Sequence, residues 1–141
     1  MILFIEDEGY YNDPYKESLQ DAGYKVILVR NINEAINIFS KRLAEIQLVI
    51  LDIMFEIPDD PPLGFDVENA LNGTRSGIEV LRLLNEVPKG TDVPKIILTN
   101  VAEERFHLEY QHSNSVKGCY KKKDVNLAKL VEIVNEIIKG K

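Results

Sequence analysis

The stretch LVILD, residues 48–52, joins four apolar residues to a single carboxylate, that of Asp52. A similar stretch opens the chain, where the apolar residues 2–5 (ILFI) are followed by the acidic residues 6–8 (EDE). Short, continuous apolar runs of this kind are typical of strands that are buried on both faces of a parallel sheet. Open α/β sheets bind their ligands beyond the carboxyl ends of the strands. The two runs therefore predict an acidic pocket at that edge of a sheet.

Strand-like and helix-like segments alternate along the rest of the chain. Further strands are expected at 26–29, 95–99 and 118–121. Apolar residues recur at helical spacing in the segments 11–22, 35–43, 78–84, 102–113 and 127–138. Asn33 is placed to cap the second of these helices. This order predicts one α/β domain over residues 1–141, a doubly wound (βα)5 fold with parallel strands in the order 2-1-3-4-5 and helices on both faces.

Composition excludes several classes of protein. The chain has 141 residues, of which 45% are hydrophobic and 28% charged, as expected of one globular domain. No apolar run approaches the roughly 18 residues of a membrane span, and no targeting leader is visible. The formal net charge of −6 argues against binding to nucleic acid. The single cysteine, Cys119, is expected to be a packing thiol in a cytoplasmic protein.

Polar side chains that can carry chemistry lie at the ends of four expected strands. Five of them are expected to converge at one edge of the sheet: Glu6, Asp7, Asp52, Thr99 and Lys123. Carboxylates in such a cluster repel one another, and a bound Mg²⁺ removes that conflict. A carboxylate beside a metal, a hydroxyl and an ammonium can attack phosphorus and form an acyl phosphate. Asp52 is the best candidate nucleophile because it is a single carboxylate at the end of a central strand.

Five segments, in this order, resemble the receiver domains of response regulators in two-component signalling. They are residues 2–8 (ILFIEDE), 48–54 (LVILDIM), 76–84 (SGIEVLRLL), 96–100 (IILTN) and 118–123 (GCYKKK). The resemblance covers nearly the whole chain and implies a flavodoxin-like fold. It also implies a signalling domain of the single-domain type, which catalyses only its own phosphorylation and dephosphorylation and is not otherwise an enzyme.

The resemblance implies a role for each acidic position. Asp52 would accept a phosphoryl group from a histidine kinase or a phosphotransfer protein. Asp7, Asp52 and the backbone carbonyl of Met54 would ligate Mg²⁺ or Mn²⁺ directly. Glu6 would act on the metal through a bound water.

The resemblance also implies a conformational switch. Thr99 would contact the phosphoryl group, Lys123 would pair with it, and Tyr120 would change rotamer on activation. The surface made by the fourth helix, the fifth strand and the fifth helix would then change by a population shift. That surface would dock an output protein or a second copy of the chain in a homodimer.

The sequence departs from the receiver pattern in two places. Asp124 follows Lys123 where receivers usually have a proline in a cis peptide bond, which costs more for other residues. An acidic, proline-containing insertion at about 55–76 separates the third strand from the third helix. Ordered loops of this length are uncommon. The insertion is expected to be either a tolerated surface loop or a lid or partner-recognition loop beside the pocket.

Two other functions remain open on the same fold. One is a pseudo-receiver, an interaction module that is never phosphorylated. The other is a Mg²⁺-dependent phosphatase with an aspartyl nucleophile. That chemistry commonly requires a second aspartate two residues after the first, and Met54 stands there instead.

Overall fold

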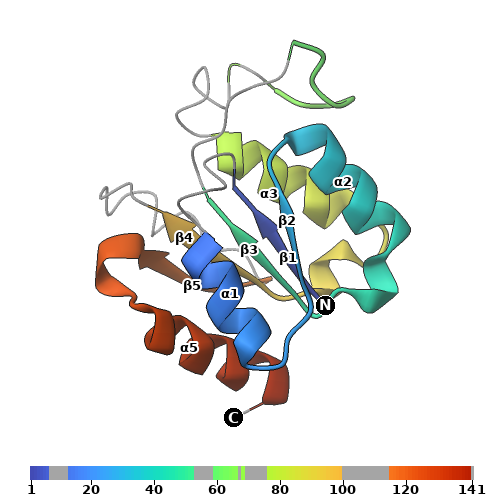
Figure 1. Cartoon of the computed structure of the whole chain (residues 1–141). Helices are drawn as coiled ribbons and strands as arrows, with labels where there is room; N and C mark the ends of the chain where they lie inside the picture. The colour runs from blue at the N-terminus through green and yellow to red at the C-terminus, as the bar shows by residue number, and fades with distance from the viewer. Residues whose placement is uncertain (7–12, 53–58, 67, 69–75, 100–114, 141) are drawn as a thin grey trace.

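A five-stranded parallel sheet forms the centre of the molecule (Figure 1). The structure, a computed structural model, describes residues 1–6, 13–52, 59–66, 68, 76–99 and 115–140. The strands are β1 (Ile2–Ile5), β2 (Val26–Val29), β3 (Leu48–Leu51), β4 (Lys95–Thr99) and β5 (Val116–Lys121). Their order is β2-β1-β3-β4-β5, which confirms the predicted doubly wound, flavodoxin-like sheet. The last strand begins at Val116, earlier than the predicted Gly118.

Helices cover both faces of this sheet (Figure 1). They are α1 (Asp13–Asp21), α2 (Ile32–Lys41), α3 (Ser76–Glu86) and α5 (Leu127–Lys139). The helix predicted at 102–113 lies outside the described residues. No helix in the described part of the chain is both long enough and apolar enough to cross a membrane.

Alternate residues of each strand enter two separate cores. In β1, Leu3 and Ile5 pack with residues of α2 and α3, such as Phe39 and Leu84. Their neighbours Ile2 and Phe4 pack on the other face, where α1 and α5 contribute Leu19, Leu130 and Val134. Because both faces are covered, β1 and β3 are apolar throughout, as the continuous runs in the sequence predicted.

Asparagines begin two of the helices. The side chain of Asn31 accepts a hydrogen bond from the backbone N–H of Glu34 at the start of α2. The side chain of Asn126 accepts one from the N–H of Lys129 at the start of α5. The expectation that Asn33 caps α2 is wrong, because α2 begins at Ile32 and its N-cap, Asn31, lies two residues before Asn33. The side chain of Asn33 instead donates to the carbonyl oxygen of Asp60, 2.8 Å away in the insertion.

Candidate functional site

Asp52 and Thr99 meet at the carboxyl edge of the sheet. Asp52 follows β3 directly, and its backbone N–H donates to the carbonyl oxygen of Ile5 at 3.2 Å. Thr99 is the last residue of β4, and its Oγ1 donates to Asp52 Oδ1 at 2.8 Å. Asp52 is only 6% exposed and Thr99 is fully buried. The two residues were predicted to converge, and the structure brings them together.

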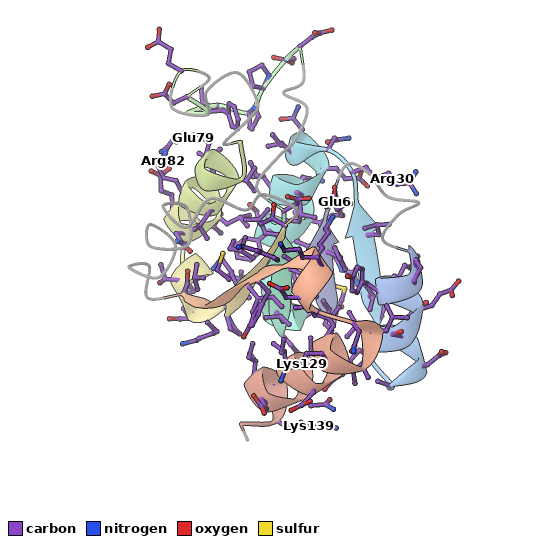
Figure 2. The ribbon with its side chains drawn as sticks, turned by 90° about the vertical axis from the view of Figure 1, so that its left-hand side faces the viewer. Glu6, Arg30, Glu79, Arg82, Lys129 and Lys139 are labelled. Carbon is purple, nitrogen blue, oxygen red and sulfur yellow. The ribbon has the colours of Figure 1, made fainter. Side chains whose placement is uncertain are left out.

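Glu6 and Lys122 complete the described part of this pocket. Glu6 follows β1 directly and is 1% exposed. Figure 2 shows it among the closely packed interior side chains, whereas Lys129 and Lys139 lie on the outer side of α5. The Lys122 ammonium donates to Glu6 Oε2 at 2.8 Å and to Asp52 Oδ2 at 3.3 Å. One lysine therefore bridges two buried carboxylates that come from neighbouring strands.

The charges of this pocket change the pKa values of its members. Burial raises the pKa of Glu6 well above its usual range, and a hydrogen bond with Asp52 and the charge of Asp52 raise it further. The Lys122 ammonium opposes this shift. Burial lowers the pKa of Lys122, but the charges of Asp52 and Glu6 more than offset it, so that its pKa is raised. Lys122 is thus held in its charged form, in a pocket with an excess of carboxylates.

The prediction that Lys123 lies in this pocket is wrong, because the structure places Lys122 there. Lys123 is exposed to solvent. Lys122 reaches the pocket because β5 ends at Lys121 and the next residue turns inward. Glu6 and Asp52 occupy the same position, the first residue after β1 and β3. Applied to the predicted fifth strand, residues 118–121, the position of Glu6 and Asp52 would have identified Lys122.

Tyr15 of α1 is a further residue of the site, and the sequence pattern did not identify its role. Its hydroxyl lies 3.0 Å from the carbonyl oxygen of Val125 and 3.3 Å from that of Lys122, and it can donate to either. Tyr15 therefore fixes the short 3-10 turn Lys122–Asp124, which carries the pocket lysine. Helical spacing indicated that Tyr15 faces the core, but its contact with residues more than 100 positions away in sequence depends on the tertiary fold.

Tyr120 lies next to the pocket, on the α5 side of β5. It pairs with Leu98, one residue before Thr99, and packs against the core that includes Val125 and Leu130. A Cβ atom on Gly118 would lie 2.6 Å from the Tyr120 hydroxyl, so the tyrosine side chain occupies the space above a residue without a side chain. This arrangement gives the ring its packing surface; the predicted change of rotamer stays a prediction.

The donor set of the pocket fits a hard divalent cation. Glu6 and Asp52 offer carboxylate oxygens, the ligands that Mg²⁺ prefers, and Lys122 is the described cation beside them. Among the described residues there is no group of three or more metal-ligating side chains. Asp7 and Met54, the other two predicted ligands, lie outside the described residues.

Solved structures similar to this fold are receiver domains. The BeF3-activated N-terminal receiver domain of Klebsiella pneumoniae RstA has a TM-score of 0.72 and 18% identity, over 98% of this chain and 97% of that one. The signal receiver domain of a putative Luxo repressor protein from Vibrio parahaemolyticus has a TM-score of 0.70 and 21% identity, over 99% and 89%. A CheY-like receiver domain protein from Methanospirillum hungatei has a TM-score of 0.66 and 21% identity, over 99% and 93%.

The fold is therefore that of a response-regulator receiver domain, as the sequence resemblance predicted. The sequence itself matches no protein-family model and no curated protein sequence. At these identities the similarity concerns the fold, and the function depends on the pocket.

Proposed function

We propose that this chain is a phosphoacceptor receiver domain of a two-component phosphorelay, with Asp52 as the acceptor. One observation carries the proposal. Within the receiver fold, a buried carboxylate at the end of a central strand accepts a hydrogen bond from Thr99 and forms an ion pair with Lys122. A hydroxyl and an ammonium on either side of a carboxylate suit the transfer of a phosphoryl group to that carboxylate.

The proposed reaction moves one phosphoryl group. An oxygen of the Asp52 carboxylate attacks phosphorus, and the P–N bond of a phosphohistidine on the donor protein breaks as the new P–O bond forms. The donor imidazole leaves and takes up a proton from solvent. Thr99 and Lys122 then donate to the phosphoryl oxygens in place of the free carboxylate, and they stabilise the charge that develops on those oxygens.

Asp7, Asp52 and the backbone carbonyl of Met54 are proposed to ligate Mg²⁺ or Mn²⁺ directly, and Glu6 is proposed to act through a metal-bound water. The metal, when bound, would neutralise charge on the carboxylates and on the incoming phosphoryl group. With the metal in place, we expect the pKa of Glu6 to fall, because a cation close to a carboxylate favours its ionised form.

Phosphorylation is proposed to change the conformation of the surface that includes β5 and α5. Thr99 would follow the phosphoryl group, and Tyr120, one residue along on the neighbouring strand, would move into the vacated space. The surface that includes β5 and α5 would then favour docking of an output protein or of a second copy of the chain. The proposed donor is a histidine kinase or a phosphotransfer protein, and the proposed location is the cytoplasm.

Intact mass spectrometry tests this proposal. The protein is incubated with Mg²⁺ and acetyl phosphate or phosphoramidate, and an added phosphoryl group is looked for in the wild type and in Asp52→Asn. We expect an adduct on the wild type that is absent from Asp52→Asn and absent when the metal is chelated. Asp52→Asn is isosteric, so its unfolding transition serves to check that the fold is retained.

The alternative is a pseudo-receiver that docks without phosphorylation. The insertion favours it, because Asp60 and Gly64 are held against α2 and α3 by hydrogen bonds that do not involve Asp52. A wild-type protein that forms no adduct and shows no binding of Mg²⁺ by calorimetry would establish this alternative instead.

A further inference from the structure

The insertion between β3 and α3 contains a tight turn at Pro62–Phe65. The backbone N–H of Phe65 donates to the carbonyl oxygen of Pro62 at 3.0 Å, and Gly64 has a φ of 85°. A positive φ at the third residue is the mark of a type II turn, and it favours glycine at that position. The second residue of the turn is Leu63, whose side chain is 100% exposed.

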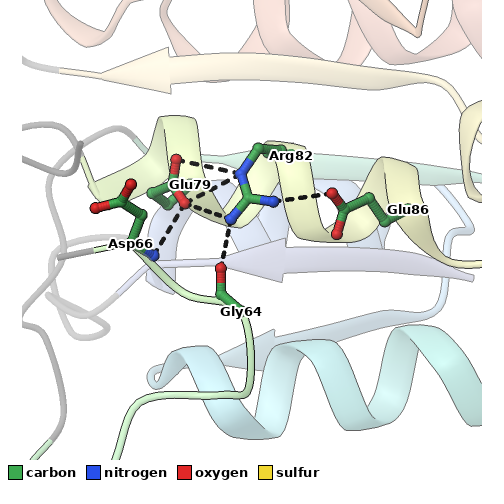
Figure 3. Close-up of polar contacts among 5 residues, drawn as sticks. All are labelled: Gly64, Asp66, Glu79, Arg82 and Glu86. Atoms are coloured by element: carbon green, nitrogen blue, oxygen red, sulfur yellow. Dashed lines mark hydrogen bonds and ion pairs between the residues drawn. The ribbon is translucent and has the colours of Figure 1, made fainter. Parts of the chain in front are cut away.

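One side of this turn is fixed to α3 (Figure 3). The Arg82 guanidinium donates to the carbonyl oxygen of Gly64 at 2.5 Å and to the Glu79 carboxylate at 2.6 Å. Glu79 is 0% exposed and also accepts from the backbone N–H of Asp66 at 3.1 Å. Phe65, between these two anchored residues, packs against the core on the α2 and α3 side of the sheet.

The other side of the turn is fixed to α2. The side chain of Asn33 donates to the carbonyl oxygen of Asp60 at 2.8 Å. Leu63 therefore projects from a segment that is attached before and after it. A binding element that is already held in one conformation loses little entropy when it docks. An exposed leucine on a preorganised turn is for this reason a better recognition element than one on an unattached loop.

The surroundings of Leu63 are acidic. Asp59, Asp60, Asp66 and Glu68 are exposed, and Arg75 is the single base in the sequence of the insertion, residues 55–76. A partner that fits this segment needs an apolar socket for the leucine and basic residues around it. Isolated exposed leucines are ordinary, but here the leucine is combined with a fixed turn and a predominance of acidic side chains in the insertion.

The turn also lies at the edge of the sheet where Asp52 lies. The residues on either side of the turn, Asp60 and Asp66, contact Asn33 in the first turn of α2 and Glu79 in the first turn of α3, and both helix starts are at the carboxyl edge (Figure 1). A protein that carries a phosphohistidine to Asp52 must cover this edge. Phosphotransfer to Asp52 therefore brings the surface of the donor protein against the turn.

We propose that the Pro62–Phe65 turn is a recognition element for the phosphodonor protein, which receives Leu63 in an apolar socket lined at its rim by lysine and arginine. The inference rests on the proposed function. The insertion would determine which donor protein binds, and the chemistry at Asp52 would be the same as in the proposed function. A small donor such as acetyl phosphate does not need this contact.

The experiment compares a protein donor with a small one. The histidine kinases and phosphotransfer proteins of the source organism are first screened with the wild type for phosphotransfer. With the donor found, Leu63→Ser is expected to lower kcat/KM for transfer from that protein at least tenfold. The same variant should accept phosphate from acetyl phosphate at the wild-type rate, because its pocket is intact.

A charge series tests the proposed basic rim. Asp59→Asn/Asp60→Asn should slow transfer from the protein donor and weaken its dependence on ionic strength. The matched control is Asp21→Asn/Asp92→Asn, which removes two exposed carboxylates from the opposite edge of the sheet and should leave both quantities unchanged.

Three outcomes would overturn the inference. If kcat/KM for transfer from the protein donor to Leu63→Ser is within twofold of wild type, the turn is not a recognition element, and the proposed function is unaffected. A wild-type protein that accepts phosphate from acetyl phosphate but from none of the donor proteins would lead to the same conclusion. A wild-type protein that accepts phosphate from neither source would remove the proposed function and this inference together.

Discussion

Lys122 and Lys95 both bury most of their side chains, but they lie at opposite edges of the sheet and in opposite electrostatic surroundings. Lys122, beyond the carboxyl end of β5, lies between two carboxylates. Lys95, at the start of β4, is 0% exposed. Its ammonium donates to the carbonyl oxygens of Gly90 at 2.7 Å and Val93 at 2.8 Å. It also lies 5.5 Å from the centroid of the Phe39 ring, within range of a cation–π contact.

The same side chain has opposite pKa shifts in these two places. Burial lowers the pKa of Lys95 to about 8. The pKa of Lys122 is raised, because the charges of Asp52 and Glu6 more than offset its burial. Carbonyl dipoles satisfy the donors of Lys95 without neutralising its charge, whereas carboxylates do both.

These opposite surroundings indicate that Lys95 is a structural lysine and that Lys122 is a candidate functional one. The Lys95 ammonium ties together the turn that contains Gly90 and Val93. The Lys122 ammonium holds two carboxylates that would otherwise repel, at the edge of the sheet where the candidate acceptor Asp52 lies. Variants at the two positions should therefore differ in their effect on phosphorylation.

The largest effect is expected for Lys95→Ala. The variant removes two buried hydrogen bonds and leaves a cavity under Phe39, so it should lower the free energy of unfolding by about 3 kcal/mol. Urea unfolding followed by circular dichroism measures this change. Lys25→Ala, at an exposed lysine, is the control and should change stability by less than about 0.5 kcal/mol. Equal effects for the two variants would show that the buried ammonium contributes nothing.

Lys122→Met should slow phosphorylation in addition to lowering stability, because it leaves two buried carboxylates without their cation. Removing one donor to a developing phosphoryl charge commonly costs about 100-fold in rate, and we expect the rate of acetyl phosphate transfer to Asp52 to fall by about that factor. The neighbouring variant Lys123→Met removes an exposed lysine and should leave the rate within about twofold of wild type. If only Lys123→Met lowers the rate of phosphorylation strongly, Lys123 is the functional lysine, as predicted from the sequence.

The lowered pKa of Lys95 predicts that its contribution to stability depends on pH. Lys95 has a pKa of about 8 in the folded protein and near 10.5 when unfolded. Between these values the unfolded chain binds more protons, so the wild type should gain stability relative to Lys95→Met as the pH is raised from about 8 to about 10.5. The slope of this difference can reach about 1.4 kcal/mol per pH unit. Urea unfolding of both proteins across this range measures it. A flat difference would mean that the pKa of Lys95 is the same in both states.

The sheet was predictable from the sequence because its strands are buried on both faces. Runs such as residues 2–5 and 48–51 need no long-range information, since continuous apolar character and short length already specify a parallel strand. The convergence of Asp52 and Thr99 then follows from the rule that parallel strands end at a common edge.

The position of the pocket lysine was predicted one residue too late, in a run of three lysines. In the segment 121–123 all three residues have the same side chain, and only the end of β5 decides which one turns inward. The contacts of the insertion were not predictable either. The bonds from Arg82 to Gly64 and from Asn33 to Asp60 depend on how two helices are placed by the sheet, which local sequence patterns do not contain.

The smallest expected effect is that of Tyr15→Phe, which separates positioning of Lys122 from contact with the phosphoryl group. The variant keeps the ring and removes the hydroxyl that fixes the turn after β5. We expect a loss of about 1 kcal/mol in stability and a fall of less than about tenfold in phosphorylation by acetyl phosphate. Tyr24→Phe is the matched control, because it removes a hydroxyl that donates to Asn135 of α5, away from the pocket. It should lower stability by a similar amount and leave phosphorylation unchanged. Equal phosphorylation rates in the two variants would mean that Lys122 holds its position through its own ion pairs with Glu6 and Asp52.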